Sequence, residues 1–486
     1  MPTLDKLNFS NRYTSLPAFF YRPVTPSPIP DAYLLHFNHS AAKLADIALD
    51  PESCNITDLL CGNALPTGAE AIATLYAGHQ FGQYVPQLGD GRAILLGGIE
   101  HEGNYWELQL KGAGTTPYSR NGDGRAVLRS SIREYLCSEA MHGLGIPTTR
   151  ALSLIGSSLP VYRESVETAA IVMRMSPSFI RFGSFEIFFH RNQPEAIRTL
   201  ADYTIQHHYA ELRDTADKYP RFLQAVVAST AKLMAQWQSV GFAHGVMNTD
   251  NMSILGLTLD YGPFGFLDHY DPHFICNHSD HAGRYAFDQQ PDVAAWNLTR
   301  LAQALSPLMS TEDAKAALGI YPAVFASTYI DIMCAKLGLS ADKSRIPLIM
   351  QLLDILHKNR VDYTIFMRKL SDFDSASDAI NAPLRDLFTD RSAFDTWAIT
   401  YRNLLNASKS NDNERALTMR RVNPKYILRN YLAENAIIAA RDHNDTSEIE
   451  RLMQVLQQPY DEHPGMETYA APPPDWAQHI SVSCSS

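Results

Sequence analysis

The stretch that decides the interpretation of this chain is Gly241-Phe242-Ala243-His244-Gly245-Val246-Met247-Asn248-Thr249-Asp250-Asn251-Met252-Ser253-Ile254-Leu255. It sets a polar cluster of His, Asn and Asp residues between two apolar runs. A short β-like run follows at once and ends in an acidic residue, an aromatic residue and a glycine, Leu257-Thr258-Leu259-Asp260-Tyr261-Gly262.

The spacing of the polar residues matches the catalytic and metal loops of protein kinases. Over the kinase pattern His-Arg-Asp-x-x-x-x-Asn, His244 takes the His position and Asn251 takes the metal-binding Asn position. The position of the catalytic Asp falls on Val246, which cannot accept a proton. Asp260 stands where the metal-binding Asp of Asp-Phe-Gly would stand. The stretch thus predicts a metal site without the usual base, and Asp250 is the only carboxylate in the loop that could replace that base.

Two β-like runs lie upstream, one opened by Gly89-Asp90-Gly91 and one running from Tyr105 to Lys111. In protein kinases, the part of the N-lobe that covers the nucleotide has this order: a glycine-rich loop, a strand, a turn and a strand that ends in lysine. Its backbone amides and the lysine ammonium group bind phosphate oxygens. Each signal has an ordinary alternative. The two glycines also suit a tight turn, and a lysine at the end of a strand is commonly a solvated charge.

A helix is predicted from Ser130 to near Gly143, and Glu134 is our candidate for the kinase-like partner of Lys111. The alternative is that Glu134 interacts only within its own helix. Ser131 and Glu134 have the spacing of a capping box, in which the glutamate would only bind the backbone at the start of the helix.

Several cationic and glycine-rich segments could surround a bound phosphate. The loop from Gly112 to Arg125 carries glycines and arginines that can wrap a polyanion, or it is a plain surface loop. Three short β-like runs are expected between Arg150 and Met175, followed by a Ser/Pro break. Arg174 and Arg181 lie on either side of this break. If they line a cleft they would bind phosphate, and if they lie on the surface they would only increase solubility.

The predicted fold class is α+β, a protein-kinase-like bilobal fold with a β-rich N-lobe and a large helical C-lobe with family-specific extensions. We expect an N-terminal wrap at 1–63, an N-lobe at 64–183, a helical C-lobe at 184–458 and a tail at 459–486. Within the C-lobe, the helical pattern predicts one helix from Ala196 to Tyr219 and another from Arg221 to Val240.

Composition restricts the class of partner. The 486-residue chain has a formal net charge of -11, which argues against nucleic acid as a partner because phosphate backbones require a basic face. We expect no apolar run that approaches the roughly 20 residues of a membrane span, and the start has no signal-like apolar core. We therefore expect a cytoplasmic protein without a membrane partner.

The segment from Leu267 to His281 contains His, Asp and Cys residues and at first resembles a zinc site. Its spacings match no pair of zinc-ligand motifs. We favour the alternative that this segment is a loop that shapes a substrate groove.

Taken in order, these motifs resemble those of the selenoprotein O family, the YdiU-type kinase-like proteins, over essentially the whole chain. The segments that carry the resemblance are Gly89-Asp90-Gly91-Arg92, Leu108-Gln109-Leu110-Lys111-Gly112, Asn121-Gly122-Asp123-Gly124-Arg125, His244-Gly245-Val246-Met247-Asn248-Thr249-Asp250-Asn251, Asp260-Tyr261-Gly262 and Ser483-Cys484-Ser485-Ser486.

The resemblance implies a pseudokinase that binds ATP in an inverted orientation and transfers AMP onto Ser, Thr or Tyr hydroxyls of protein substrates. By position, Asp250 would accept the proton, while Asn251 and Asp260 would hold Mg²⁺, with Mn²⁺ as an alternative. The residues that would bind the nucleotide are Gly89, Gly91, Arg92, Lys111, Asp123, Gly124, Arg174, Arg181 and Asp260. Two rivals stay open, namely an ordinary kinase that transfers the γ-phosphoryl group and a nucleotide-binding scaffold without turnover.

Two cysteines support a further hypothesis of redox regulation. Cys276 lies just beyond the metal loop and Cys484 lies in the C-terminal tail, so a reversible disulfide between them could gate the groove. The alternative is two unrelated thiols. Some relatives carry selenocysteine near the C-terminus, and here that place is occupied by Cys484 or lost.

Overall fold

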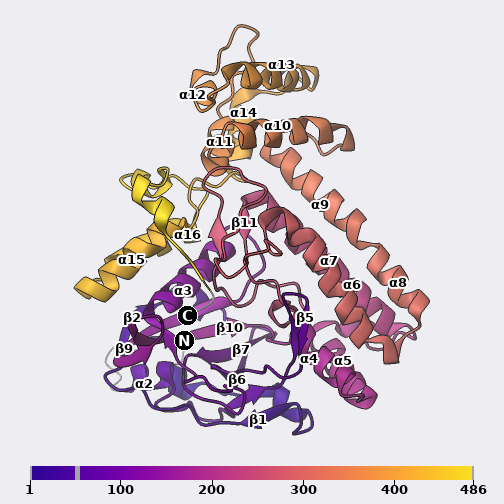
Figure 1. Ribbon diagram of the computed structural model, residues 1–486, viewed down its shortest axis with the longest axis vertical. Helices are drawn as coiled ribbons and strands as arrows, with labels where there is room; N and C mark the ends of the chain where they lie inside the picture. The colour runs from indigo at the N-terminus through magenta and orange to yellow at the C-terminus, as the bar shows by residue number, and fades with distance from the viewer. Residues whose placement is uncertain (1–2, 50–54, 484–486) are drawn as a thin grey trace.

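A computed structural model describes residues 3–49 and 55–483 of the chain. The N-terminal part is built around one large β-sheet, and the C-terminal part is almost entirely helical (Figure 1). The prediction of a mixed α and β protein, with a β-rich N-terminal part and a helical C-terminal part, is therefore confirmed.

The main sheet is antiparallel, and its strands follow the order β1-β3-β6-β7-β10-β9-β2, with β8 paired to β10. Two separate two-stranded ribbons pair β4 with β5 and β11 with β12. The strands are β1 (Tyr21–Pro23), β2 (Tyr33–Phe37), β3 (Ile72–Thr74), β4 (Gly78–Gln80), β5 (Gln83–Val85), β6 (Ala93–His101), β7 (Asn104–Lys111), β8 (Ala126–Val127), β9 (Arg150–Tyr162), β10 (Val166–Ser176), β11 (Phe242–Ala243) and β12 (Gly265–Phe266).

The predicted order of strand, turn and strand before Lys111 is present as the hairpin of β6 and β7, with His101 opposite Asn104 at the turn. The expectation of three short strands between Arg150 and Met175 is wrong, because this region forms the two long strands β9 and β10. Strand β9 pairs with β2 on one side and β10 on the other. Pairing on both sides keeps the strand continuous through its small residues Ser153, Gly156, Ser157 and Ser158.

Both faces of the sheet are covered. On one face, Leu95, Leu154 and Val172 join a core with helix α3 (Leu128–Gly143) and the first long helices of the C-terminal part. On the other face, Ile94 and Leu108 pack against N-terminal segments. The alternation of buried side chains along β6 thus fixes the sheet between two cores.

The remaining helices continue the chain after the sheet and are named here with their bounds. They are α4 (Phe182–His190), α5 (Pro194–His208), α6 (Lys218–Val240), α7 (Gln290–Ala304), α8 (Thr311–Gly319), α9 (Tyr321–Lys336), α10 (Ile346–Lys358), α11 (Tyr363–Leu370), α12 (Ala382–Arg385), α13 (Arg391–Ala407), α14 (Asp412–Arg420), α15 (Asn430–His443) and α16 (Ser447–Gln457), after the N-terminal α1 (His39–Lys43) and α2 (Ile56–Cys61). Short 3-10 turns connect several of them, including Thr249–Asn251 in the decisive stretch.

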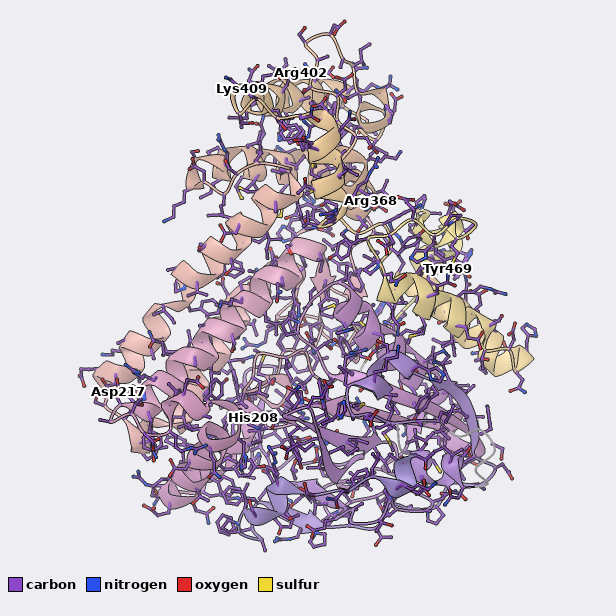
Figure 2. The ribbon with its side chains drawn as sticks, turned by 180° about the vertical axis from the view of Figure 1, so that it is seen from behind. His208, Asp217, Arg368, Arg402, Lys409 and Tyr469 are labelled. Carbon is purple, nitrogen blue, oxygen red and sulfur yellow. The ribbon has the colours of Figure 1, made fainter. Side chains whose placement is uncertain are left out.

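The single helix expected from Ala196 to Tyr219 is wrong. Helix α5 ends at His208, a 3-10 turn follows, and α6 begins at Lys218. His208 and Asp217 lie on either side of this break (Figure 2). The intervening segment is mostly polar, so it offers no continuous apolar stripe that could be buried by a longer helix.

Helices α10 to α14 pack into a separate core and form the end of the molecule farthest from the sheet (Figure 1). Trp397 and Tyr401 stack at the centre of this core, with ring centroids 4.9 Å apart. Lys409, just beyond α13, lies at the far end (Figure 2). The candidate site described below contains no residue of these helices.

One helical stretch, Thr311–Lys336, is long and apolar enough to cross a membrane by length and composition alone, and 28% of its 18-residue apolar window is buried. This finding differs from the expectation that no stretch would qualify. It is weak support for a membrane span, because core helices of soluble proteins pass the same test. Here α8 and α9 pack along α6.

Glu107 in β7 allows the burial of this strand to be tested. Its side chain is 3% exposed, and its Oε2 accepts a hydrogen bond from the Phe179 backbone at 2.9 Å. Burial raises the pKa of Glu107 to about 8, above the value of roughly 4.3 expected in the unfolded chain. The folded protein therefore binds more protons between these two values, and its stability falls as pH rises through this window.

We expect Glu107→Gln, which retains an acceptor for Phe179, to remove this dependence. Between pH 5 and pH 8 the free energy of unfolding of the wild type should decrease by on the order of a few kcal/mol more than that of the variant. Urea unfolding at the two pH values measures the difference. Equal pH dependence in the two proteins would show that Glu107 is not buried as described.

Candidate functional site

A cavity of about 570 Å³ lies between the sheet and the stretch that follows α6. This volume is within the range of roughly 300–1,000 Å³ that is usual for small-molecule sites. All the residues predicted to bind nucleotide or metal line this one cavity, although they come from segments far apart in the sequence. They are Gly89, Gly91, Arg92, Lys111, Asp123, Gly124, Arg174, Arg181, Asp250, Asn251 and Asp260.

The centre of the cavity is a cluster of buried charges around Asp260. One carboxylate oxygen lies 3.3 Å from Lys111 Nζ and 2.5 Å from Arg174 Nη1, and the other lies 2.6 Å from Arg181 Nη1. The two arginines are each 2% exposed and Lys111 is 9% exposed. The alternative that Arg174 and Arg181 are surface charges is therefore wrong.

Glu134 forms the second anionic point of the cluster. Its carboxylate lies 2.5 Å from Lys111 Nζ and 3.0 Å from Arg174 Nη1. The predicted pairing of Lys111 with Glu134 is thus confirmed. The capping-box alternative is wrong, because α3 begins at Leu128, two residues before the predicted start, and Glu134 lies well inside the helix.

The pKa values in the cluster follow from burial and charge. Burial alone would raise the pKa of Asp260, but Arg174, Arg181 and Lys111 together hold it well below its usual range. Burial lowers the pKa of Lys111, an effect that Glu134 and Asp260 oppose. Asp260 also has a backbone φ of 56°, a left-handed conformation that is uncommon outside glycine and asparagine-like residues. Such a conformation at a charged centre is typical of functional sites.

The loop after α6 presents oxygen atoms beside Asp260. The side-chain nitrogen of Asn251 donates to the Val246 carbonyl at 2.9 Å, which leaves the amide oxygen as the atom that could bind a cation. His244 is buried, its ring stacks on Trp237, and its Nε2 lies 2.9 Å from the Leu259 carbonyl oxygen. His244 thereby ties this loop to the segment that carries Asp260.

Asp250 is buried at the wall of the cavity. Its Oδ1 has no hydrogen-bond partner within the described ranges, and its Oδ2 lies 3.4 Å from Gln80 Nε2. Burial raises the pKa of Asp250 to about 7. An unpartnered carboxylate oxygen with a pKa near neutrality suits a proton acceptor. Beside it, Asn251 and Asp260 provide the oxygen donors that hard divalent cations prefer, so these two residues fit such an ion.

Two glycines of the cavity lie where side chains cannot. Gly89 has a φ of 75°, and a Cβ there would lie 2.4 Å from the Tyr118 ring. Gly124 has a φ of 67°, and a Cβ there would lie 2.0 Å from the Gly114 carbonyl oxygen. The glycine-rich loops are therefore packed against each other at the cavity wall.

Asp123 lies on the outer part of the cavity and makes a two-pronged ion pair with Arg163, at 2.8 and 2.9 Å. The hydrogen bonds from Arg163 hold the pKa of Asp123 below its usual value. Arg163 also lines the cavity but was not predicted. It lies in the connection between β9 and β10, where nothing in the sequence distinguishes it from a surface arginine.

The sequence analysis also missed the ribbon of β4 and β5. Gln80 and Phe81 of this segment line the cavity, and the Phe81 amide donates to the Tyr285 hydroxyl, which in turn donates to Asn248. The available signal was the stretch Gly78-His79-Gln80-Phe81-Gly82, two glycines around polar and aromatic residues. Its strands are too short to show a periodicity.

The segment from Leu267 to His281 forms no group of three metal-ligating side chains within residues 3–49 and 55–483. Cys276 in this segment is buried, and its Sγ donates to the Ala243 carbonyl at 3.5 Å. The His278 amide donates to the Val482 carbonyl at 2.9 Å, so the C-terminal tail passes beside this segment. Cys484 lies outside the described residues.

Comparison with known proteins gives a consistent result. The model of the family described as "Protein adenylyltransferase SelO" matches residues 3–457. A protein of Thiobacillus denitrificans described as "Protein nucleotidyltransferase YdiU" is 63% identical over 488 residues, with both chains covered completely. Proteins with the same description from Myxococcus xanthus and Thioalkalivibrio sulfidiphilus are each 54% identical, again over the full length of both chains. This chain therefore belongs to the SelO family of protein adenylyltransferases.

Proposed function

We propose that this protein transfers AMP from ATP to hydroxyl groups of protein substrates. The observation that carries the proposal is the buried group of three cations, Lys111, Arg174 and Arg181, around Asp260. Such a group suits the terminal phosphates of ATP, which would enter it if the nucleotide binds in the inverted orientation. The α-phosphorus would then face the acceptor hydroxyl near Asp250.

In the proposed reaction the oxygen of a Ser, Thr or Tyr hydroxyl attacks the α-phosphorus of ATP. The bond from the α-phosphorus to the bridging oxygen breaks, and pyrophosphate leaves. Asp250 takes the proton of the attacking hydroxyl. Its unpartnered Oδ1 and its pKa of about 7 support this role, because an effective general base has a pKa near the working pH.

Asn251 and Asp260 are the residues that would hold the divalent cation, which we propose to be Mg²⁺ with Mn²⁺ as an alternative. The ion would neutralise phosphate charge. Asp260 contacts three cationic side chains in the structure. Phosphate oxygens can take over Arg174 and Arg181 by bidentate hydrogen bonds, and this exchange would release the Asp260 carboxylate for the metal.

We further propose that the molecule has a protein-kinase-like bilobal arrangement with the boundaries given above. The support is the pairing of Lys111 at the end of β7 with Glu134 in α3, together with the order of the glycine loop, the His244 loop and Asp260. A cytoplasmic location and the absence of nucleic-acid and membrane partners are also proposals. The net charge of -11 supports the exclusion of nucleic acid.

The rival functions differ in which phosphorus is transferred. We expect that incubation with Mg²⁺ and a generic protein acceptor will transfer label from ATP labelled on the α-phosphate and none from ATP labelled on the γ-phosphate. The reason is that the kinase base position is Val246, which cannot accept a proton. Label only from the γ-phosphate would establish a kinase. Measurable ATP binding without transfer of either label would establish a scaffold.

Two aspartates should separate chemistry from metal binding. We expect Asp250→Asn to slow AMP transfer by roughly 10²–10⁴ while leaving the affinity for ATP nearly unchanged, because proton transfer contributes about this much. Asp260→Ala should abolish transfer and weaken Mg²⁺-dependent ATP binding. Isothermal titration with and without Mg²⁺, beside the transfer assay, measures both effects. Equal loss of ATP binding in the two variants would contradict the assigned roles.

We also propose that Cys276 and Cys484 form a reversible disulfide that gates the groove. The hydrogen bond between His278 and Val482 supports it, because each residue is two positions from one of the cysteines. Peptide mapping without reductant, after mild oxidation, should recover the two cysteines in one linked pair of peptides. Recovery of both as unlinked thiols would exclude the disulfide.

A further inference from the structure

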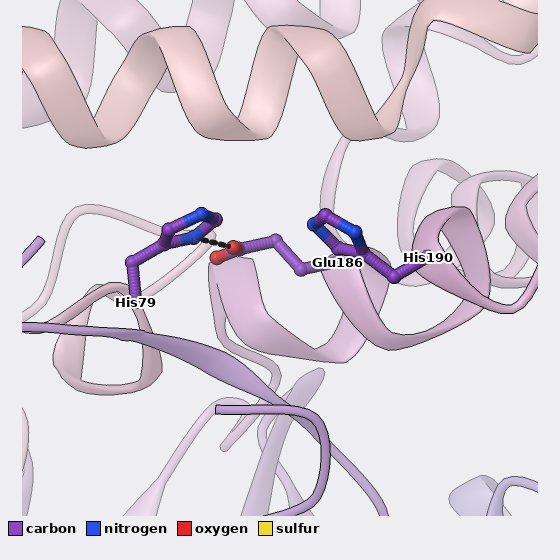
Figure 3. Close-up of side chains that lie close together, drawn as sticks. All are labelled: His79, Glu186 and His190. Atoms are coloured by element: carbon purple, nitrogen blue, oxygen red, sulfur yellow. Dashed lines mark hydrogen bonds and ion pairs between the residues drawn. The ribbon is translucent and has the colours of Figure 1, made fainter. Parts of the chain in front are cut away.

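A second group of potential ligands lies outside the catalytic cavity. His79 in β4, and Glu186 and His190 in α4, bring ligand atoms within 4.8 Å of one another. Figure 3 shows the Glu186 side chain between the two imidazole rings, with its carboxylate toward His79. Glu186 and His190 are one helical turn apart, which places them on the same face of α4. None of the three lines the catalytic cavity, and neither the sequence motifs nor the proposed reaction uses them.

Glu186 is the best indication that this group has a ligand. Its side chain is 1% exposed, and one oxygen, Oε2, is hydrogen-bonded to His79 Nδ1. The other oxygen, Oε1, is buried and has no hydrogen-bond partner in the described part of the chain. An unsatisfied buried carboxylate oxygen is costly. A cation bound at this oxygen would remove the cost.

The two imidazoles are held in place by packing. The His79 ring meets Trp296 of α7 edge-on, with centroids 5.4 Å apart, and the His190 ring lies 3.7 Å from the ring of Tyr84. His79 is 8% exposed, whereas His190 is exposed at the end of its helix. The group is therefore ordered on its inner side and reachable from solvent on its outer side.

We propose that His79, Glu186 and His190 form a binding site for a divalent transition-metal ion, with Zn²⁺ as the expected occupant. Two imidazoles and one carboxylate are a common ligand set of zinc sites that keep a fourth position for water. Mg²⁺ and Ca²⁺ prefer sites built from oxygen atoms, so this site is chemically different from the one near Asp260. The ion must draw the three ligand atoms closer together than they are in the structure, since Zn–N and Zn–O distances are about 2.0–2.2 Å.

The site is connected to the catalytic loop through β4. The backbone amide of His79 donates to Thr249 Oγ1 at 2.7 Å, and the next residue, Gln80, contacts Asp250. A Cβ on Gly78, the preceding residue, would lie 2.7 Å from Asp250 Oδ1. An ion held by His79 and α4 would therefore fix the strand that lies directly against Asp250.

The test uses the full-length protein after chelation, titrated with Zn²⁺ in the absence of nucleotide and followed by equilibrium dialysis with elemental analysis. His190→Ala is the main variant, because His190 is exposed and its loss should not prevent folding. His443→Ala is the matched control, since His443 is also an exposed histidine at the last position of its helix, α15. Asn251→Ala tests whether the catalytic metal loop accounts for the binding.

We expect one Zn²⁺ per chain in the wild type, in His443→Ala and in Asn251→Ala, and at least a tenfold weaker affinity in His190→Ala. Added Zn²⁺ should raise the melting temperature of the wild type but not of His190→Ala, because only a folded protein with the site gains the binding energy. Co²⁺ in place of Zn²⁺ should give a visible absorption spectrum that Glu186→Gln alters. Equal Zn²⁺ affinity in the wild type and His190→Ala, or loss of binding in Asn251→Ala alone, would overturn the proposal.

Discussion

The contact of the Asp260 carboxylate with three buried cations is the interaction on which the rest of the structure depends. Lys111 comes from β7, Arg174 from β10 and Arg181 from the residue before α4. One side chain thus connects the sheet to the start of the helical region and to the segment that follows the catalytic loop. Removal of one partner from a buried ionic group typically costs about 3–5 kcal/mol, because the remaining charge is left unpaired.

The same cluster explains why the cavity suits a polyphosphate. Three cations, Lys111, Arg174 and Arg181, face two carboxylates, Glu134 and Asp260. Burial raises the pKa of the nearby Asp90 and Asp250 carboxyls. The cavity thus gathers three buried cations although the whole chain has a net charge of -11. Local arrangement, and not overall charge, decides which ligand this site attracts.

The sequence was sufficient to predict those parts of the fold and the site whose motifs follow one another in a recognisable order. The hairpin of β6 and β7 and the pairing of Lys111 with Glu134 were predicted because glycine loop, strand, lysine and helix follow one another within a short segment. Arg174 and Arg181 could not be assigned from their own surroundings, since a buried arginine and a surface arginine look alike in a sequence. The two arginines belong to the site because the fold brings Asp260, which lies 79 residues beyond Arg181, into contact with both of them.

The ribbon of β4 and β5 was not predicted, because its strands are short and its contacts join residues far apart in the sequence. His79 and Glu186 are 107 residues apart in the sequence, and β4 has only three residues, so neither spacing nor periodicity could bring them together. Successive side chains of a strand point to opposite sides. His79 accordingly faces α4 while Gln80 contacts Asp250. A ligand that holds one side of such a short strand must also restrict the residue on the other side, so the position of Asp250's neighbour depends on what His79 binds.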